Sequence, residues 1–281
     1  MKNILSADLF RLRHQKSTWL IPLLTFIILF LFGCIKGFLV GNAGWLKLFH
    51  EAINDGLSTV EQQTGLGSLG DLSSILGGSY PDTASYIASS FQRDSIMSLV
   101  IFVSVYAAAV RRGGFVKNIG KLCNSFGYSL TQAVVLLGYS VIIMAVNLCA
   151  VWLSTLLFFE KTQFGNAGSL ILYFLITALL HWAECLMVVL MCDWFKSPTT
   201  GIIIGCIYTG AAASLICSVV NLVFELAFKT GFKINHIMPY GFSLIMRYDS
   251  APSYLYGVGL SAVYLLIFFA GKALIRKKDI L

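Results

Sequence analysis

The sequence predicts an all-α membrane protein: one transmembrane domain over residues 1–281, with six transmembrane helices and both termini in the cytoplasm. Three observations predict this class. Hydrophobic residues form 57% of the 281 residues, charged residues only 12%, and the mean hydropathy is +0.80. A soluble chain carries roughly twice that charged fraction, so too few polar residues exist to cover a water-facing surface. The other two observations are six long apolar runs and an uneven distribution of Lys and Arg between them.

This composition excludes a secreted module, a cytosolic enzyme and a disordered protein. The net charge of +7 is better explained by cytoplasmic loops facing anionic lipid than by binding to nucleic acid. The seven cysteines show no CxxC motif and no Cys/His ligand spacing. We therefore expect small buried apolar residues, with no metal site, disulfide framework or cofactor in this chain.

Each transmembrane helix needs about 20 apolar residues to cross the hydrocarbon layer. Six runs meet this need, although the second contains Arg93 and Asp94 near one end. The third and fifth exceed it and must tilt, kink or project beyond the bilayer. In chain order the predicted spans are 19–40, 86–110, 130–159, 169–192, 199–228 and 254–275.

The distribution of basic residues predicts the orientation. Thirteen Lys and Arg residues fall on the side that carries both termini, against six on the other side, and Lys36 lies inside the first span. Because short cytoplasmic loops are enriched in Lys and Arg, both termini are expected in the cytoplasm.

The first 18 residues predict a short amphipathic helix before the first span. Leu5, Leu9 and Leu12 share one face, and Arg11 and Arg13 point elsewhere. Such a helix would lie in the cytoplasmic interface. The alternative is an ordinary positively charged flank.

The cytoplasmic segment 111–129 predicts a short surface helix. An apolar stripe could enter a groove on a partner, while Lys117 and Lys121 occupy another face. The alternative is a basic interfacial turn. The expected docking residues are Phe115, Lys117, Asn118, Ile119, Lys121 and Leu122.

The longest polar segment, 41–85, is expected to be an extracytoplasmic loop. Together with the start of the second run, to residue 95, it holds six acidic residues against Lys47 and Arg93. It could cap an exit path or attract a cationic substrate. The alternative is a solvated connector.

Two groups inside the spans could line a substrate path or serve helix packing. His181 and Glu184 share a face near the middle of the fourth span, where an ionised carboxylate is costly. They could form a proton or cation site, or a hydrogen-bonded packing pair. Gly201, Gly205 and Gly210 in the fifth span permit close helix approach, either within one chain or at a dimer axis.

Three segments resemble the permeases of type-2 ABC exporters. The N-terminal LSADLFRLRHQKSTWLIPLL resembles the entry of these chains into their first span. The segment RRGGFVKNIGKLCNSFGYSL resembles their cytoplasmic loop after the second span. The end FFAGKALIRKKDIL resembles their usual basic C-terminus. The ordered set extends over the whole chain.

The resemblance implies a permease of the bacterial plasma membrane. Two copies would pair and dock onto two separate ATPase subunits, which bind ATP and Mg. The N-terminal stretch would correspond to the interfacial elbow helix of the family, and residues 114–125 to its coupling helix. The chain has no G-x-x-x-x-G-K-[ST] motif, so it is expected to be non-catalytic.

The leading functional hypothesis is an exporter that moves an amphipathic substrate outward, expected to be a peptide such as a toxin, bacteriocin or antimicrobial. The alternative is an ion-coupled secondary transporter that uses His181 and Glu184. An intramembrane enzyme is a third class, but no nucleophile is evident beside this pair.

Overall fold

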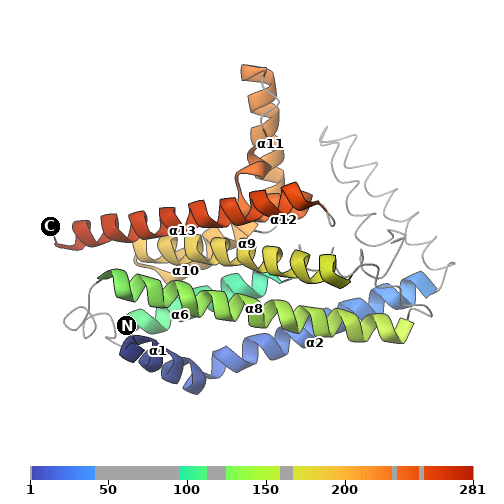
Figure 1. The fold of residues 1–281 in the computed structure, drawn as a ribbon, viewed down its shortest axis with the longest axis horizontal. Helices are drawn as coiled ribbons and strands as arrows, with labels where there is room; N and C mark the ends of the chain where they lie inside the picture. The colour runs from blue at the N-terminus through green and yellow to red at the C-terminus, as the bar shows by residue number, and fades with distance from the viewer. Residues whose placement is uncertain are drawn as a thin grey trace.

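The computed structural model describes residues 2–41, 95–112, 125–158, 167–209, 211–229, 233–246 and 250–280. These residues contain helices and no strand, which confirms the all-α class. With the labels of Figure 1, the helices are α1 (Lys2–His14), α2 (Lys16–Gly41), α6 (Ile96–Arg112), α8 (Ser125–Phe158), α9 (Ala167–Trp194), α10 (Pro198–Thr209), α11 (Ala211–Phe228), η1 (Ile234–His236), α12 (Pro239–Ile245) and α13 (Ala251–Ile280).

Four helices in the described part of the chain are long and apolar enough to cross a membrane. They contain the first, third, fourth and sixth predicted runs, within a few residues at each end. The second run is present as a shorter apolar helix, Ile96–Val110, and its earlier residues lie outside the described part. The four stretches are Lys16–Ile35, Phe126–Leu157, Gly168–Trp194 and Ala251–Ile275.

The fifth apolar run is not one continuous helix, so this expectation is corrected. It is divided between α10 and α11, with Gly210 between them in the sequence. Figure 1 shows α11 standing across the direction in which α8, α9 and α13 run.

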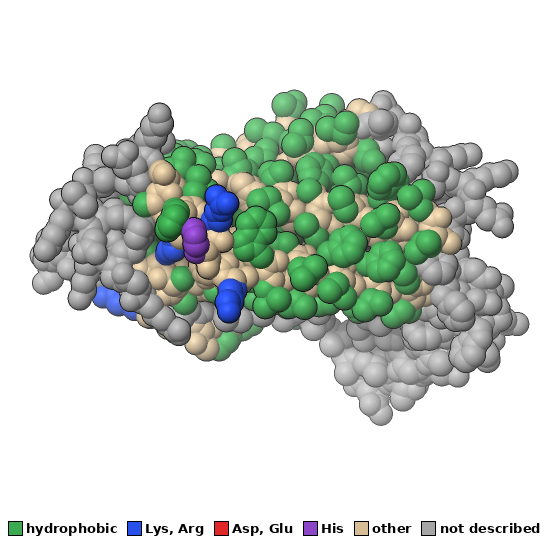
Figure 2. Space-filling model, turned by 90° about the horizontal axis from the view of Figure 1, so that it is seen from below, with side chains coloured by type: hydrophobic (Ala, Val, Ile, Leu, Met, Phe, Trp, Pro, Cys, Tyr) green, Lys and Arg blue, Asp and Glu red, His purple; other side chains and the backbone are tan. Residues whose placement is uncertain are grey.

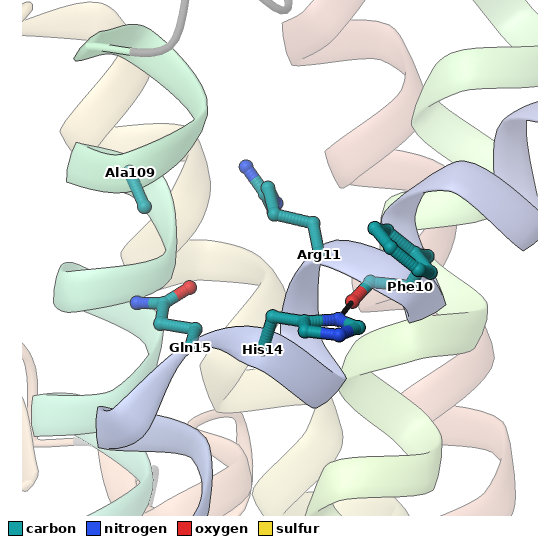
Figure 3. A pocket seen from close by; sticks show the side chains of 5 residues that line it. All are labelled: Phe10, Arg11, His14, Gln15 and Ala109. Atoms are coloured by element: carbon teal, nitrogen blue, oxygen red, sulfur yellow. Dashed lines mark hydrogen bonds between the residues drawn. The ribbon is translucent and has the colours of Figure 1, made fainter.

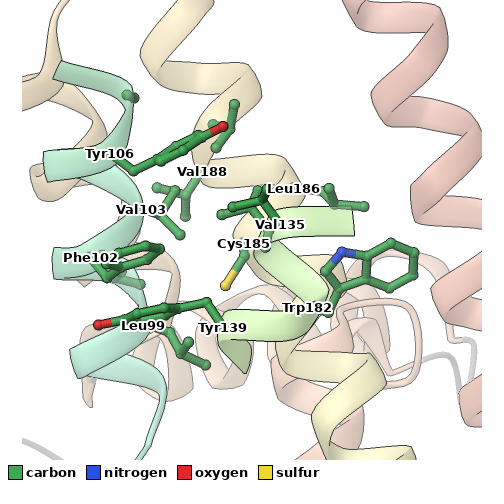
Figure 4. Close-up of a cluster of buried hydrophobic side chains, with 14 of the residues drawn as sticks. Leu99, Phe102, Val103, Tyr106, Val135, Tyr139, Trp182, Cys185, Leu186 and Val188 are labelled. Atoms are coloured by element: carbon green, nitrogen blue, oxygen red, sulfur yellow. The ribbon is translucent and has the colours of Figure 1, made fainter. Parts of the chain in front are cut away.

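The bundle is built from two helix pairs, α2 with α8 and α9 with α13, joined where α8 contacts α9. Helices α6 and α10 pack against each other and against α9. One core cluster lies where α6, α8 and α9 meet. Figure 4 shows Phe102 and Tyr139 stacked there, near Leu99 and Leu186.

The outward faces of these helices are apolar. Leu255 and Leu266 on α13 are 76% and 69% exposed, and Leu23 and Leu31 on α2 are more than half exposed. Water would penalise such a surface, whereas lipid does not, so the structure supports a multi-pass membrane protein.

The start of α1 and the end of α13 lie at the same end of the bundle (Figure 1). We call this the terminal end. The C-terminal end of α6 and the N-terminal end of α8 lie there too. The segment that joins them, residues 113–124, therefore begins and ends at the terminal end.

Candidate functional site

The predicted docking residues lie outside the described residues. This applies to Phe115, Lys117, Asn118, Ile119, Lys121 and Leu122, and also to residues 42–85 of the predicted outer loop. The later part of segment 111–129 is corrected: Ser125 begins α8, so residues 125–129 form its first turn rather than a loop.

The predicted polar pair lies deep inside the bundle. His181 and Glu184 are both 0% exposed, one helical turn apart on α9. The backbone N–H of Tyr240 donates to Glu184 Oε1 at 2.5 Å. Tyr240 is the second residue of α12, after Pro239, so the carboxylate satisfies a backbone donor that this helix leaves without an intrahelical partner. Glu184 thus acts as a cap supplied by another helix.

The segment that contains α12 is buried rather than solvated. Pro239, Phe242 and Ser243 are among its buried residues. Upstream, the Asn221 side chain on α11 accepts a hydrogen bond from the N–H of Ile234 at 2.7 Å, which fixes the turn that leads into α12. Sequence reasoning missed this element. Its only local signal is Pro239 at the first helical position before an apolar stretch.

The chemistry available at this interior site is proton exchange and hydrogen bonding by one imidazole and one carboxyl group. Glu184 Oε2 is buried and accepts no hydrogen bond from any described residue. The described residues contain no group of three or more His, Cys, Asp or Glu that could hold a metal ion. The hydrogen bond that positions the Glu184 carboxylate is the one it accepts from Tyr240 N–H at the start of α12.

Of the three predicted glycines, Gly205 lies at a close contact within the chain. A Cβ added to Gly205 would lie 2.5 Å from Val100 Cγ1 and 3.5 Å from Val188 Cγ2, so α10 approaches α6 and α9 at this point. Gly201 lies in the first part of α10, and Gly210 is outside the described residues.

Two further glycines, which sequence reasoning missed, join α13 to α9. A Cβ on Gly257 would lie 2.8 Å from Ile176 Cγ2, and one on Gly271 would lie 2.7 Å from two methyl carbons of Leu190. The spacing between the contacts is the same in both helices, so α9 and α13 run parallel. Small residues allow such close packing in lipid.

A polar cluster closes the same helix pair at the terminal end. Lys272 Nζ on α13 donates to Gln132 Oε1 on α8 at 2.6 Å and forms an ion pair with Asp193 at the end of α9. Gln132 donates in turn to the hydroxyl of Tyr128. In the sequence, the signal was one acidic and one basic residue, Asp193 and Lys272, near the C-terminal ends of the fourth and sixth predicted spans.

A second charged contact attaches α1 to α6. The Tyr106 hydroxyl donates to Asp8 Oδ2 at 2.6 Å, and Arg11 Nη2 lies 2.6 Å from Asp8 Oδ1. Burial raises the pKa of Asp8, and the hydrogen bond from Tyr106 and the charge of Arg11 partly oppose this. The residues of the predicted apolar face meet different surroundings: Leu12 is buried and Leu9 is 52% exposed, while Asp8 is buried against α6.

The chain matches no family model, no curated protein and no solved structure. Its function is therefore argued from its own residues and their arrangement.

Proposed function

We propose that this chain is the membrane-spanning permease subunit of an ATP-driven exporter in a bacterial plasma membrane. Two copies pair, and each docks one ATPase subunit that binds ATP and Mg. The chain itself performs no catalysis. The resemblance of its three terminal and loop segments to type-2 ABC permeases motivates the proposal.

The observation that carries the proposal is the position of α1. This helix is separate from the first span and is held against α6 by Asp8, Tyr106 and Arg11. Its exposed side carries Leu9 and Phe10 as well as Arg13. Apolar and basic groups side by side suit a helix lying in the interface. An interfacial helix of this kind is what the resemblance implies.

The same end of the bundle is suited to receive an ATPase. The segment 113–124 leaves α6 and returns to α8 there, near the start of α1 and the end of α13 (Figure 1). If this segment is helical, as the resemblance implies, Phe115, Ile119 and Leu122 would share one apolar face. An ATPase docked at this end would contact the permease where the ends of several helices gather.

The proposed substrate is an amphipathic peptide with positive charge. The described outward faces are largely apolar, and the buried polar residues are mostly Ser and Thr, several of whose hydroxyls donate to carbonyls of their own helices. A wide aqueous path for a strongly polar solute has no support in these residues. The acidic outer segment would attract a cation, an effect that salt should weaken.

Copurification tests the proposal. The chain is expressed with candidate ATPase subunits, and retention of the ATPase and its hydrolysis rate are measured. Replacing Phe115 and Ile119 with Asp should release the ATPase, because unpaired charges buried in an apolar groove cost several kcal/mol. Lys233→Asp, an exposed change between α11 and α12, is the matched control and should retain it. Retention of the ATPase by the Phe115→Asp/Ile119→Asp variant would refute the docking role.

A further inference from the structure

A shallow pocket of about 550 Å³ lies between α1 and α6, next to the corner where α1 meets α2. Its lining residues are Phe10, Arg11, His14, Gln15 and Ala109. Figure 3 shows Ala109 on α6 facing α1, with Arg11 and Gln15 extending into the space between the two helices. Three of the five lining side chains carry nitrogen donors, and Phe10 supplies an apolar wall.

The side chains around this pocket are basic. Arg13 and His14 are exposed in the last turn of α1, and Lys16 is exposed at the start of α2. The one acidic residue of α1 is Asp8, which is buried and paired with Arg11. Figure 2 shows Lys, Arg and His side chains gathered at one end of a broad hydrophobic face, with no acidic side chain among the described residues visible there. The patch therefore complements an anion.

The pocket lies at the edge of the apolar surface. Trp19 is 65% exposed, and its indole Nε1 donates to the Arg13 carbonyl at 3.0 Å. Tryptophan is enriched at the membrane–water interface. Beyond it, Leu23, Ile27 and Leu31 continue an exposed apolar stripe along α2. The basic patch is thus at headgroup level, and the stripe below it is at the level of the acyl chains.

We propose that this pocket, the α1–α6 pocket, binds the headgroup of one anionic phospholipid. The phosphate lies beside the exposed imidazole of His14, whose Nδ1 contacts the Phe10 carbonyl at 2.9 Å. It accepts a hydrogen bond from the second N–H of Gln15 Nε2, whose first N–H donates to Ser17 Oγ. Arg11 adds positive charge from the pocket wall without direct contact, because its guanidinium nitrogens are buried and paired with Asp8. Arg13 and Lys16 add charge attraction, and an acyl chain lies along the exposed stripe of α2. This lipid site does not depend on the proposed export function, because only α1, the start of α2 and one face of α6 form it.

This occupant fits better than a soluble anion. A free phosphate would use the donors but not the apolar stripe that continues from the pocket. A zwitterionic lipid would use the stripe but would bring its own cation against Arg13 and Lys16. Only a lipid with net negative charge uses both features.

The test counts lipids on the full chain by native mass spectrometry. The protein is purified in detergent, stripped of copurified lipid, and titrated with phosphatidylglycerol or phosphatidylcholine. We expect one tightly retained phosphatidylglycerol, no comparable retention of phosphatidylcholine, and no displacement by millimolar inorganic phosphate. Displacement by inorganic phosphate, or equal retention of both lipids, would overturn the proposal.

Two variants distinguish a headgroup bound in the α1–α6 pocket from general electrostatic attraction to the basic side chains around it. Arg13→Gln/Lys16→Gln should weaken phosphatidylglycerol binding roughly thirtyfold, since each basic residue near an anionic surface contributes about 1 kcal/mol. Both side chains are exposed, so folding should be unaffected. Ala109→Leu should weaken binding several-fold with no change in charge, because the larger side chain fills the pocket wall. Lys229→Gln/Lys233→Gln removes the same charge from the α11–α12 connection and should bind like the wild type. Wild-type binding by Ala109→Leu would refute the pocket as the seat.

Discussion

Glu184 and Asp8 are carboxylates in apolar surroundings, and each has a specific hydrogen-bond donor. Tyr240 N–H donates to Glu184, and the Tyr106 hydroxyl donates to Asp8. A buried polar group without such a partner is strongly unfavourable. Sequence alone predicted that Glu184 is buried, because it lies mid-span. It could not predict the donor, which comes from α12, far along the chain.

Substitution of Glu184 distinguishes a cap from an ion-coupling group. Glu184→Gln keeps an acceptor oxygen for Tyr240 and should leave stability nearly unchanged. Glu184→Ala leaves that N–H unsatisfied and should lower the free energy of unfolding by about 1–3 kcal/mol. Unfolding in mixed micelles measures both.

Transport by the same variants tests the alternative function. If Glu184 only caps α12, Glu184→Gln should transport like the wild type. Loss of transport in a fully stable Glu184→Gln variant would instead favour the ion-coupled secondary transporter.

Asp8 makes the attachment of α1 sensitive to pH. Burial raises its pKa above the ordinary value of 3.8, so folding favours the protonated form. Its contribution to stability is greatest below that value and declines as pH rises through the raised pKa. Asp8→Asn cannot titrate but keeps an acceptor for Tyr106. The stability of the wild type relative to Asp8→Asn should therefore fall from about pH 4 upward in detergent unfolding experiments. A relative gain with rising pH would contradict this.

At the scale of helices, composition predicts that an apolar run is helical better than it predicts whether the run forms one continuous helix. The runs that form α2, α8, α9 and α13 are uniformly apolar and long, so their spans follow from length alone. The fifth run is equally apolar, yet it is divided near Gly210. The mean hydropathy of a run does not show where its helix will be divided. It also does not show that α12, which follows η1, will pack against α9.

The glycine contacts of α13 give a prediction with a control on the same helix. Gly271→Ile places a branched side chain against Leu190, where an added Cβ would already lie 2.7 Å from its methyl carbons. Overpacking of this kind costs about 1–3 kcal/mol. Gly259→Ile meets nothing within 4 Å at its Cβ and should be nearly neutral. Equal stability of the two variants would show that α13 does not pack closely on α9 at this point.

For the whole molecule, the testable property is orientation. The excess of Lys and Arg predicts that the terminal end faces the cytoplasm. In a background without native cysteines, a membrane-impermeant maleimide added outside intact cells should label Lys233→Cys. It should not label Ser197→Cys, which joins α9 to α10 at the terminal end. The reverse pattern would invert the topology.

The sequence predicted the class of the molecule and most of its helices, but not its tertiary contacts. Amphipathicity predicted α1 as a separate helix with Leu5, Leu9 and Leu12 on one face, but it could not predict that Asp8 attaches this helix to α6 through Tyr106. The Lys272–Asp193 pair and the α9–α13 glycines depend on which helices become neighbours. Periodicity within one helix carries no such information.

The parallel contact between α9 and α13 restricts how these two helices can move relative to each other. Gly257 on α13 packs against Ile176 on α9, and fourteen residues later in both helices Gly271 packs against Leu190. Next to this second contact, Lys272 forms an ion pair with Asp193. Sliding one helix along the other would force backbone against methyl groups at two points and separate a charge pair. Helices α9 and α13 should therefore move together as one rigid unit. A change of shape in this molecule should rotate or tilt them together and place its displacement where α9 meets α6, α8 and α10.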